Sequence, residues 1–311
     1  MNTLRQAAQE YLTMRRSLGY KPQEAGKRLL DFITFMEQRR ASYITQSLAL
    51  AWAKQPSDVL PGEWARRLSC VRMFARHRSA TDPRTQTPPA ALLPYRPKRA
   101  QPYMYSDEEI KELLRAALKL PAKSGLRPWT YHCLFGLLSV TGLRVGEAQN
   151  LELQDVDLRA GVLTIRGAKF GKSRLVPLHA STRRVLADYI ARREQVWANR
   201  PVSSYLFVSN WGNRLDGGDI RRTFYALSRQ IGLRGPSDSR GPRLHDMRHG
   251  FASKTLLRWY RAGENAEQRL PILSAYLGHV HWSDTFWYLS ALPELMHEAM
   301  SRLERRWEDR P

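Results

Sequence analysis

The sequence has few cysteines, few acidic residues and no long apolar run. Only two of its 311 residues are cysteines, Cys70 and Cys133, which is too few for a disulfide-stabilised scaffold. No stretch approaches the roughly 18 consecutive apolar residues of a membrane-spanning helix. Residues 1–6 also contain no apolar core of a signal peptide. We therefore expect a cytoplasmic protein with no membrane attachment.

The shortage of acidic residues points to a polyanionic partner. The chain has 50 Lys and Arg against 29 Asp and Glu, a formal net charge of +21. Residues 1–100 hold 18 basic and 7 acidic residues, a net +11, and residues 101–311 hold the remaining +10. Charge spread over both halves favours a partner that touches both. Composition alone leaves DNA, RNA and an anionic membrane as alternatives.

The first part of the chain has apolar residues at helical spacing. The predicted helices cover residues 4–14, 29–36, 44–52 and 64–74. The last of them has a basic outer face that includes Arg66, Arg67, Arg72 and Arg76. Prolines crowd residues 79–105, where they remove backbone donors and favour extended chain. We predict a helical domain over 1–95, a linker over 96–105 and a second domain over 106–311.

The second domain is predicted to be mostly helical with a small β-sheet. Ser106 and Glu109 form a capping box that leads into a helix over 110–120. Further helices are predicted at 129–140, 145–151, 181–197, 218–231, 245–260, 268–277 and 292–306. Strands are predicted at 163–166 and 174–178, joined by a short glycine-containing turn, with another candidate at 205–208. The fold class is therefore mainly α with a small sheet.

Four short stretches of this domain carry residues suited to phosphodiester chemistry. They are residues 141–147 (Thr-Gly-Leu-Arg-Val-Gly-Glu), 167–174 (Gly-Ala-Lys-Phe-Gly-Lys-Ser-Arg), 245–249 (His-Asp-Met-Arg-His), and 277–279 (Leu-Gly-His) with Tyr288 beyond. The arginine fork matches two phosphate oxygens, and histidine moves protons near neutral pH. A tyrosine supplies an oxygen nucleophile, but its hydroxyl ordinarily has a pKa near 10, so nearby positive charge must help it ionise.

Two other interpretations of these stretches fit the residues less well. A phosphate-binding P-loop has four residues between its glycines and runs into a helix, whereas Gly167 and Gly171 enclose three and precede a predicted strand. His245 and His249 have the spacing of a zinc-binding pair, but Asp246 stands where that motif has Glu. Arg248 beside them would also repel a cation.

Together the four stretches resemble the tyrosine recombinases, the phage integrase family. The resemblance covers roughly residues 106–306, and the basic helical part before it is similar to the core-binding domain of that family. It implies that Arg144 and Arg248 bind the scissile phosphate and that Tyr288 is the nucleophile. It also implies a site that needs no cofactor and no metal.

The same resemblance implies supporting roles for four further residues. Lys169 would protonate the leaving 5′ oxygen, and His245 would assist proton transfer to and from the tyrosine. His279 would hydrogen-bond the phosphate, and Glu147 matches the acidic position that supports the active site. Lys172 is a rival for the role of Lys169, which we prefer for its spacing within the hairpin. With the basic residues on the fourth helix, Lys172 and Arg174 are also predicted to bind DNA.

The resemblance implies a site-specific recombinase or integrase acting on double-stranded DNA. Strands would be exchanged through a 3′-phosphotyrosine and a Holliday junction in a homo-tetramer, or in a hetero-assembly with related recombinases. The segment from Arg248 to His279 is longer than in compact members and resembles transposon-borne ones, which suggests a mobile element in a bacterial nucleoid. A terminal helix over 292–306 would dock on its own domain or on a neighbour. The alternatives are a type IB-like topoisomerase and a catalytically silent DNA-binding accessory protein.

Overall fold

The chain folds into two compact units, residues 1–100 and 101–311, in a computed structural model. Most of each unit is helical, with one small antiparallel sheet in the second, so the predicted fold class is confirmed. The structure describes residues 3–20, 22–93, 101–122, 125–166, 173–238, 240–279, 281, 283–289, 294, 297, 298, 300, 301 and 304. No helix among these residues is long and apolar enough to cross a membrane.

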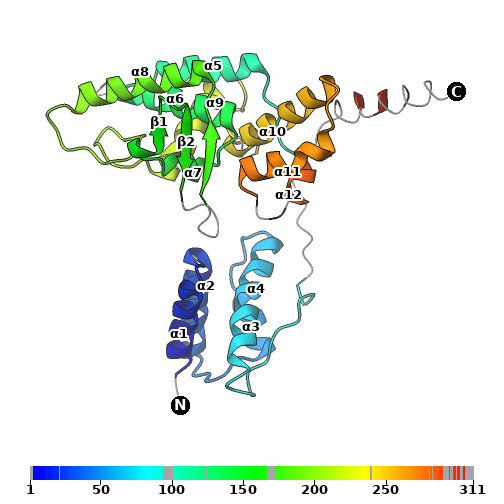
Figure 1. Cartoon of the computed structure of the whole chain (residues 1–311). Helices are drawn as coiled ribbons and strands as arrows, with labels where there is room; N and C mark the ends of the chain where they lie inside the picture. The colour runs from blue at the N-terminus through cyan, green and yellow to red at the C-terminus, as the bar shows by residue number, and fades with distance from the viewer. Residues whose placement is uncertain are drawn as a thin grey trace. The chain divides into compact units, whose positions relative to one another are not determined.

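The first unit is built from four helices around one apolar core (Figure 1). They are α1 (Leu4–Ser17), α2 (Gln23–Gln38), α3 (Gln46–Lys54) and α4 (Pro61–Arg78), so all four predicted helices are present. Thr3 and Gln6 close a capping box at the start of α1, and Pro61 is the first residue of α4. Phe32, Trp52 and Phe74 are fully buried between the helices.

The first part of the proline-rich stretch, residues 79–93, still packs against the first unit. Within it, the backbone N–H of Gln86 donates to the carbonyl of Ile44 at 2.8 Å. Arg72 on α4 donates from Nε to the carbonyl of Pro88 and from Nη2 to that of Pro89, both at 2.8 Å. Residues 79–93 therefore pack back on the helices of the first unit.

The second unit is organised around α6, against which α5, α8 and α10 pack. Its helices are α5 (Asp107–Leu118), α6 (Leu126–Thr141), α7 (Val145–Gln149), α8 (Ala180–Trp197), α9 (Gly217–Gln230), α10 (Leu244–Arg261), α11 (Ala266–Leu277) and α12 (Ser283–Leu289), with a 3-10 turn η1 (Leu153–Asp155). The capping box of Ser106 and Glu109 is present at the start of α5. Helix α12 was not predicted, and most of the predicted helix over 292–306 lies outside the described residues.

The sheet has three antiparallel strands in the order β1-β2-β3. They are β1 (Val156–Asp157), β2 (Val162–Ile165) and β3 (Arg174–Pro177), so both predicted hairpin strands are confirmed. Leu163 pairs with Val176, and both are fully buried against the core. The predicted strand over 205–208 is wrong: Tyr205 and Val208 form only single bridges, to Glu152 and Arg214.

A second, smaller apolar cluster joins the last three helices of this unit. It contains Ala252 and Leu256 of α10, Leu270, Leu273 and Leu277 of α11, and Tyr288 of α12. Because the ring of Tyr288 belongs to this core, α12 is held against α10 and α11 rather than projecting from the surface.

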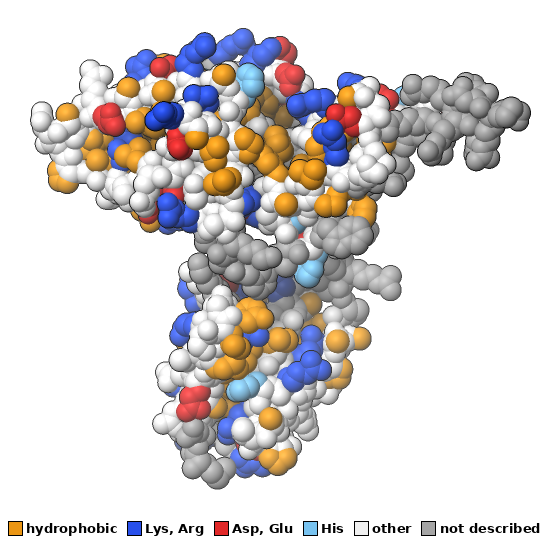
Figure 2. Space-filling view, viewed as in Figure 1, with side chains coloured by type: hydrophobic (Ala, Val, Ile, Leu, Met, Phe, Trp, Pro, Cys, Tyr) orange, Lys and Arg blue, Asp and Glu red, His pale blue; other side chains and the backbone are white. Residues whose placement is uncertain are grey.

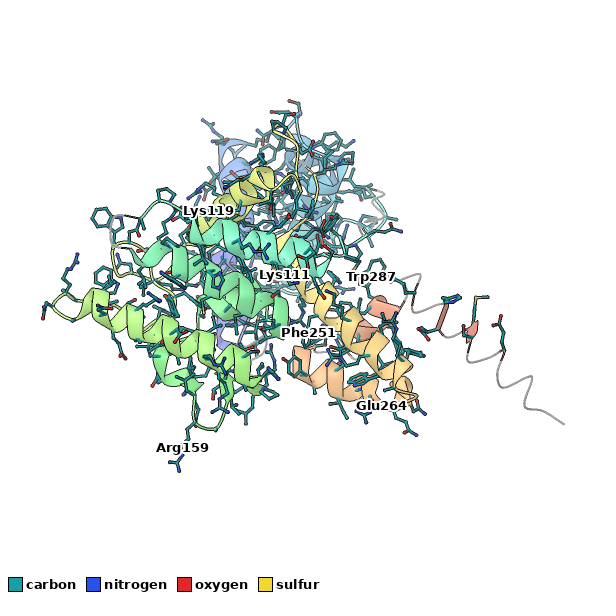
Figure 3. The ribbon with its side chains drawn as sticks, turned by 90° about the horizontal axis from the view of Figure 1, so that it is seen from above. Lys111, Lys119, Arg159, Phe251, Glu264 and Trp287 are labelled. Atoms are coloured by element: carbon teal, nitrogen blue, oxygen red, sulfur yellow. The ribbon has the colours of Figure 1, made fainter. Side chains whose placement is uncertain are left out.

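Basic side chains are scattered over the surface rather than gathered in one tail. Figure 2 shows Lys and Arg on the visible faces of both units, interspersed with acidic and apolar side chains. In the second unit Lys111 lies on α5, Lys119 directly follows that helix, and Arg159 projects from the turn between β1 and β2 (Figure 3). The charge of the sequence is thus presented by folded elements of each unit.

Candidate active site

The turn between α6 and α7 sets the direction of Arg144. Helix α6 ends at Gly142, whose φ of +62° lies in the left-handed region and whose N–H donates to the carbonyl of Leu138. A Cβ at this position would lie 2.6 Å from Cδ1 of Phe251, so both the backbone and the packing require glycine. Two residues later, Arg144 stands at the N-cap of α7.

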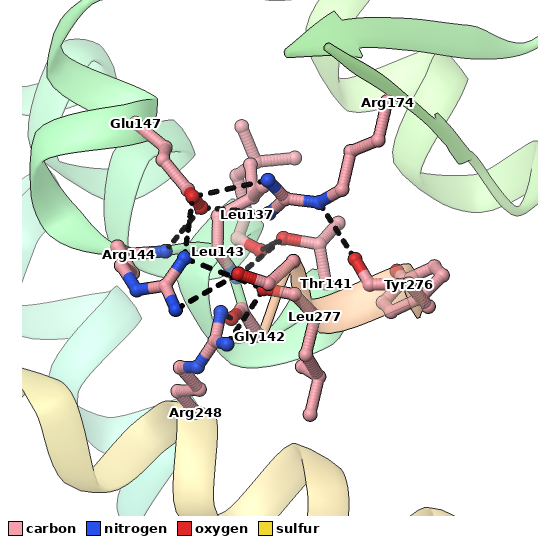
Figure 4. A network of polar contacts seen from close by, with 11 residues as sticks. Leu137, Thr141, Gly142, Leu143, Arg144, Glu147, Arg174, Arg248, Tyr276 and Leu277 are labelled. Carbon is pink, nitrogen blue, oxygen red and sulfur yellow. Dashed lines mark hydrogen bonds and ion pairs between the residues drawn. The ribbon is translucent and has the colours of Figure 1, made fainter. Parts of the chain in front are cut away.

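Two arginines from distant elements converge beside this turn (Figure 4). Arg248 of α10 is 2% exposed and donates from Nη1 to the carbonyl of Gly142 at 2.9 Å and from Nη2 to that of Leu277 at 2.7 Å. Arg144 donates to the same Leu277 carbonyl at 3.4 Å and to the carbonyl of Gly278 at 3.2 Å. The turn after α11 is therefore bound by both guanidinium groups.

Glu147 is the one carboxylate bonded within this cluster of described residues. It accepts from the backbone N–H and from Nη1 of Arg144, both at 2.9 Å. Arg174, the first residue of β3, donates from Nη1 and Nη2 to its two oxygens at 3.0 and 2.8 Å. Burial by itself would raise the pKa of Glu147, but the bonds from Arg174 and Arg144 hold it below its usual value. The carboxylate is therefore ionised at neutral pH.

Tyr288 lies between two histidine rings. It is 3% exposed, and its ring stacks on His279 with centroids 5.8 Å apart and planes at 20°. His249 of α10 meets the same ring edge-on at 5.1 Å and 64°. His245, one helical turn earlier, stands perpendicular to His249 at 5.0 Å. Nδ1 of His279 lies 2.8 Å from Oγ1 of Thr285, which ties the histidine to α12.

These histidines are neutral at pH 7. Burial, reinforced by Arg248 and Arg144, lowers the pKa of His279 to about 4. Burial and then His245 lower the pKa of His249 to about 4. The pKa of His245 is also lowered, by desolvation and then by Arg248, although the residue is exposed at the surface. Neutral imidazoles can accept a hydrogen bond or a proton, but a pKa of about 4 makes His249 and His279 weak bases at pH 7, which leaves His245 the better placed of the three for proton transfer.

The surroundings of Arg248 act on the pKa of its guanidinium in opposite directions. Burial lowers the pKa of its guanidinium, while the neighbouring Tyr288 phenol raises it and Arg144 lowers it. A charge held this deep in a protein demands compensation, which here comes from backbone carbonyls and from Glu147 nearby. An anion arriving at this point would find two guanidinium groups already placed.

Most of the predicted catalytic residues therefore lie in one cluster. The structure brings together Arg144, Glu147, His245, Arg248, His279 and Tyr288. Lys169 and Lys172 lie outside the described residues. Among the residues that the structure does describe, no group of three or more His, Cys, Asp and Glu side chains is arranged to hold a metal ion.

The predicted DNA-binding arginines have different surroundings. Arg174 is bonded inside the cluster, with a side chain that is 12% exposed. On α4, Arg67 lies over the ring of Trp52 and donates to its carbonyl, and Arg72 binds the proline-rich stretch. Arg66 and Arg76 are exposed on the same helix.

Sequence reasoning missed one residue of the cluster. His249 entered only as half of a candidate zinc pair, whereas the structure places it against both His245 and Tyr288. Its Nδ1 is buried without a partner among the described residues. The signal was present, because positions four apart on a helix share a face.

Comparison with known proteins defines the class of this site. A family model described as the phage integrase family matches residues 104–294. With the fold and the cluster above, that match defines an enzyme that breaks and rejoins DNA. The chain belongs to the phage integrase family, the tyrosine recombinases.

Relatives and a solved structure agree with this assignment. The chain is 64% identical, over the full length of both proteins, to y4rB of Sinorhizobium fredii, which is named as an integrase/recombinase. It is 31% identical to the tyrosine recombinase XerD of Bradyrhizobium diazoefficiens, over 74% of this chain and 72% of that protein. The integrase of transposon Tn1549, solved with transposon right end DNA, shares the fold with a TM-score of 0.67 at 16% identity, covering 96% of this chain and 98% of that one.

Proposed function

We propose that this chain is a site-specific recombinase that cuts and rejoins double-stranded DNA through a 3′-phosphotyrosine on Tyr288. The observation that carries the proposal is the convergence of Arg144 and Arg248 on one carbonyl, that of Leu277, next to the buried tyrosine. Two guanidinium groups at one point suit a phosphate whose charge grows during the reaction.

The two arginines keep donors available for such a phosphate. An arginine has five N–H donors. Among the described residues, backbone carbonyls and Glu147 take three donors of Arg144, and backbone carbonyls take two of Arg248, which also has a side-chain hydrogen bond with Tyr288. In the proposed reaction the remaining donors bind the non-bridging oxygens of the scissile phosphate. His279, which stacks on Tyr288, would add a hydrogen bond to the same group.

In the proposed chemistry the hydroxyl oxygen of Tyr288 attacks the phosphorus and the bond to the 5′ oxygen breaks. The tyrosine proton passes to a neutral imidazole, for which His245 is the candidate, and Lys169 protonates the leaving 5′ oxygen. A 5′ hydroxyl of a partner strand then attacks the phosphotyrosine and releases Tyr288. One phosphoester is exchanged for another at each step, so the bond energy is kept and neither nucleotide hydrolysis nor a cofactor is required.

The surroundings of the cluster support approach of a DNA backbone. A hollow of about 370 Å³ beside His245 is lined by Val145, Gly217, Arg221, Tyr225, Arg243 and Leu244. Tyr288, however, is covered in this structure. We therefore propose that DNA binding shifts α12 far enough for the hydroxyl to reach the phosphate.

Assembly and biological setting extend the same proposal. We propose a homo-tetramer on two DNA sites, or a hetero-assembly with related recombinases, that passes through a Holliday junction inside the bacterial nucleoid. A mobile element is the favoured setting, because the long segment between Arg248 and His279 resembles that of transposon-borne members. That segment contains most of α10 and the whole of α11, and the connection between the two helices includes Gly263, with a φ of +74°.

The nucleophile is tested on a suicide substrate, a duplex nicked near the cleavage site so that the covalent complex accumulates. DNA flanking the gene supplies the candidate sites, and mapping the protein–DNA junctions identifies them. Wild-type protein should form an adduct and Tyr288→Phe should form none. Tyr276→Phe is the matched control, since this tyrosine stacks on Phe251 in the same cluster and should keep the adduct.

Adducts formed equally by Tyr288→Phe would contradict the assignment of the nucleophile. Relaxation of supercoiled plasmids that lack every cleaved site would favour a type IB-like topoisomerase instead. If wild-type protein cleaves no flanking DNA but still binds it, the chain would be a DNA-binding accessory protein.

A further inference from the structure

Arg174 joins three separate segments of the second unit. It is the first residue of β3, and its side chain is 12% exposed. Nη1 and Nη2 grip the two oxygens of Glu147 on α7, and Nε donates to the carbonyl of Tyr276 on α11 at 2.7 Å. A strand, a short helix and the end of a long helix thus meet at one guanidinium (Figure 4).

The turn after α11 is shaped around this guanidinium. Gly278 has a φ of +66°, and a Cβ there would lie 2.7 Å from Nη1 of Arg174. Any other residue would push against the arginine as well as strain the backbone. His279 follows directly, so the place of its ring depends on where Arg174 holds the turn.

All three nitrogens of Arg174 are committed to protein partners. These bonds take three of its five N–H donors, one on each nitrogen, and the side chain is 12% exposed, so little of Arg174 is presented to a DNA phosphate. Glu147 in turn holds Arg144 through both its backbone N–H and its Nη1. The position of Arg144 therefore depends on a carboxylate that Arg174 fixes on its other side.

From these contacts we infer that Arg174 is a positioning residue: it orients Glu147, and through it Arg144, and it pins the turn that carries His279. The inference rests on the proposed function for its effect on catalysis. It replaces the direct DNA contact expected for Arg174 from the sequence. A lysine cannot take this role, since a single ammonium cannot grip both oxygens of Glu147 and reach Tyr276 as well.

The charges around Glu147 allow the positioning role of Arg174 to be measured through the pH dependence of the reaction. Facing its carboxylate are Arg144 from α7, Arg174 from β3 and Arg248 from α10. Arg174 forms an ion pair with the ionised carboxylate. The stabilisation from this ion pair is therefore present when Glu147 is charged and absent when Glu147 is protonated. Without Arg174, burial raises the pKa of Glu147, and mild acid then releases Arg144.

The first experiment measures catalysis and binding separately for Arg174→Met and Arg174→Lys. On the suicide substrate we expect the rate of adduct formation to fall about 10–100-fold for both variants at pH 7.5, because a small misplacement of the phosphate-binding groups is costly. The ratio of variant to wild-type rate should fall further towards pH 5.5. DNA affinity should change less than about threefold, and the salt dependence of binding should stay the same.

A double variant shows whether the effect passes through Glu147. Glu147→Gln should itself slow adduct formation, and adding Arg174→Met should slow it by less than Arg174→Met does alone, because both changes remove the Glu147–Arg174 interaction and only the second removes the bond to Tyr276. Fully multiplied effects would overturn the coupling. Arg174→Met could instead lose DNA affinity and show a weaker dependence of that affinity on salt, with both restored in Arg174→Lys. That result would assign a direct phosphate contact to Arg174.

A measurement independent of activity separates this inference from the proposed function. Urea unfolding of wild type and Arg174→Met is compared between pH 4.5 and 7. The destabilisation should grow as the pH rises, because the folded variant keeps Glu147 protonated to a higher pH than the folded wild type does, and once ionised its buried carboxylate has one partner fewer. A constant difference, or one that shrinks with pH, would overturn the role. If wild type forms no adduct while this growth is seen, the proposed function fails and the positioning of Glu147 stands.

Discussion

Gly142 links a backbone conformation to the position of a guanidinium. Its left-handed φ ends α6, its carbonyl accepts from Arg248, and its missing Cβ leaves room for Phe251. Phe251 is itself stacked on Tyr276, so it has little freedom to move aside. A change at this one position acts at once on the turn, on the apolar packing and on the site.

We expect Gly142→Ala to lower the free energy of unfolding by roughly 2–4 kcal/mol, the sum of left-handed strain and overpacking against Phe251. Urea unfolding measures it. The matched control is Gly146→Ala on α7, where an added Cβ meets nothing within 4 Å and the helix gains up to about 1 kcal/mol. Equal effects of the two substitutions would contradict this account of the turn.

The buried histidines make stability depend on pH. His249 has a pKa of about 4 in the folded chain against about 6.5 when unfolded. Between these values the unfolded state binds more protons, so the free energy of unfolding falls as the pH drops from 6.5 towards 4. His249→Phe keeps an aromatic edge beside Tyr288 and removes the proton uptake. Its unfolding free energy, followed by urea titration, should fall less steeply than that of wild type; parallel curves would contradict the prediction.

Local patterns in the sequence predict which residues gather in the cluster better than they predict which partners those residues bond. Arg144, Arg248 and Tyr288 each stand in a continuous run whose order is informative. Arg174 was predicted to bind DNA because the sequence shows its positive charge but not its partners in the fold. Its partners lie 27 residues away at Glu147 and 102 residues away at Tyr276, separations that no local pattern encodes.

At the scale of elements, length explains most of the outcomes, with the five-residue α7 as an exception that was predicted. Helices of nine or more residues, such as α1 and α8, show enough periods to be recognised. Helix α12 has seven residues and β1 has two, too few for a pattern. Residues 205–208 were taken for a strand because they are apolar. Leu206, Phe207 and Val208 are buried, but the bond from the Leu206 N–H to the carbonyl of Leu151 belongs to the single bridge between Glu152 and Tyr205 and not to a longer strand.

Helix α4 separates arginines that hold the first unit together from those that face solvent. Arg67 lies 3.8 Å from the Trp52 ring centroid, and Arg72 binds carbonyls of the proline-rich stretch. Arg66 makes only an exposed ion pair with Glu63, a kind worth little in stability. The basic pattern of the sequence could not distinguish the two kinds, because both occur on one amphipathic helix.

We expect Arg67→Ala and Arg72→Ala to lower the free energy of unfolding by about 1–3 kcal/mol each, through lost charge-assisted hydrogen bonds and the contact with Trp52. Arg66→Ala with Arg76→Ala should leave stability within about 0.5 kcal/mol. The double variant should instead weaken DNA binding. Thermal unfolding and a DNA titration on the same samples give both quantities, and a reversed order of effects would contradict the division.

At the scale of the molecule, the net charge divides almost evenly between the units, while few of the charges belong to the site. Arg144, Arg174 and Arg248 are bonded within the cluster. Exposed arginines such as Arg66 on α4 and Arg221 beside the hollow near His245 remain available to a duplex. Sequence composition predicted the amount and spread of charge, and only the folded structure tells which charges are already engaged.

If both units hold DNA, the affinity for duplex should fall steeply with salt, because each neutralised phosphate releases counterions. Each contact adds about 0.9 to the slope of log affinity against log salt. Arg66→Ala with Arg76→Ala should lower that slope by up to about 2, and Arg221→Ala by up to about 1. Combined, the losses should add, since the sites lie in different units and share no partner. Binding titrations from low to moderate salt measure the slopes. A slope unchanged by Arg221→Ala but lowered by the pair on α4 would mean that the exposed charge tested in the second unit faces away from DNA.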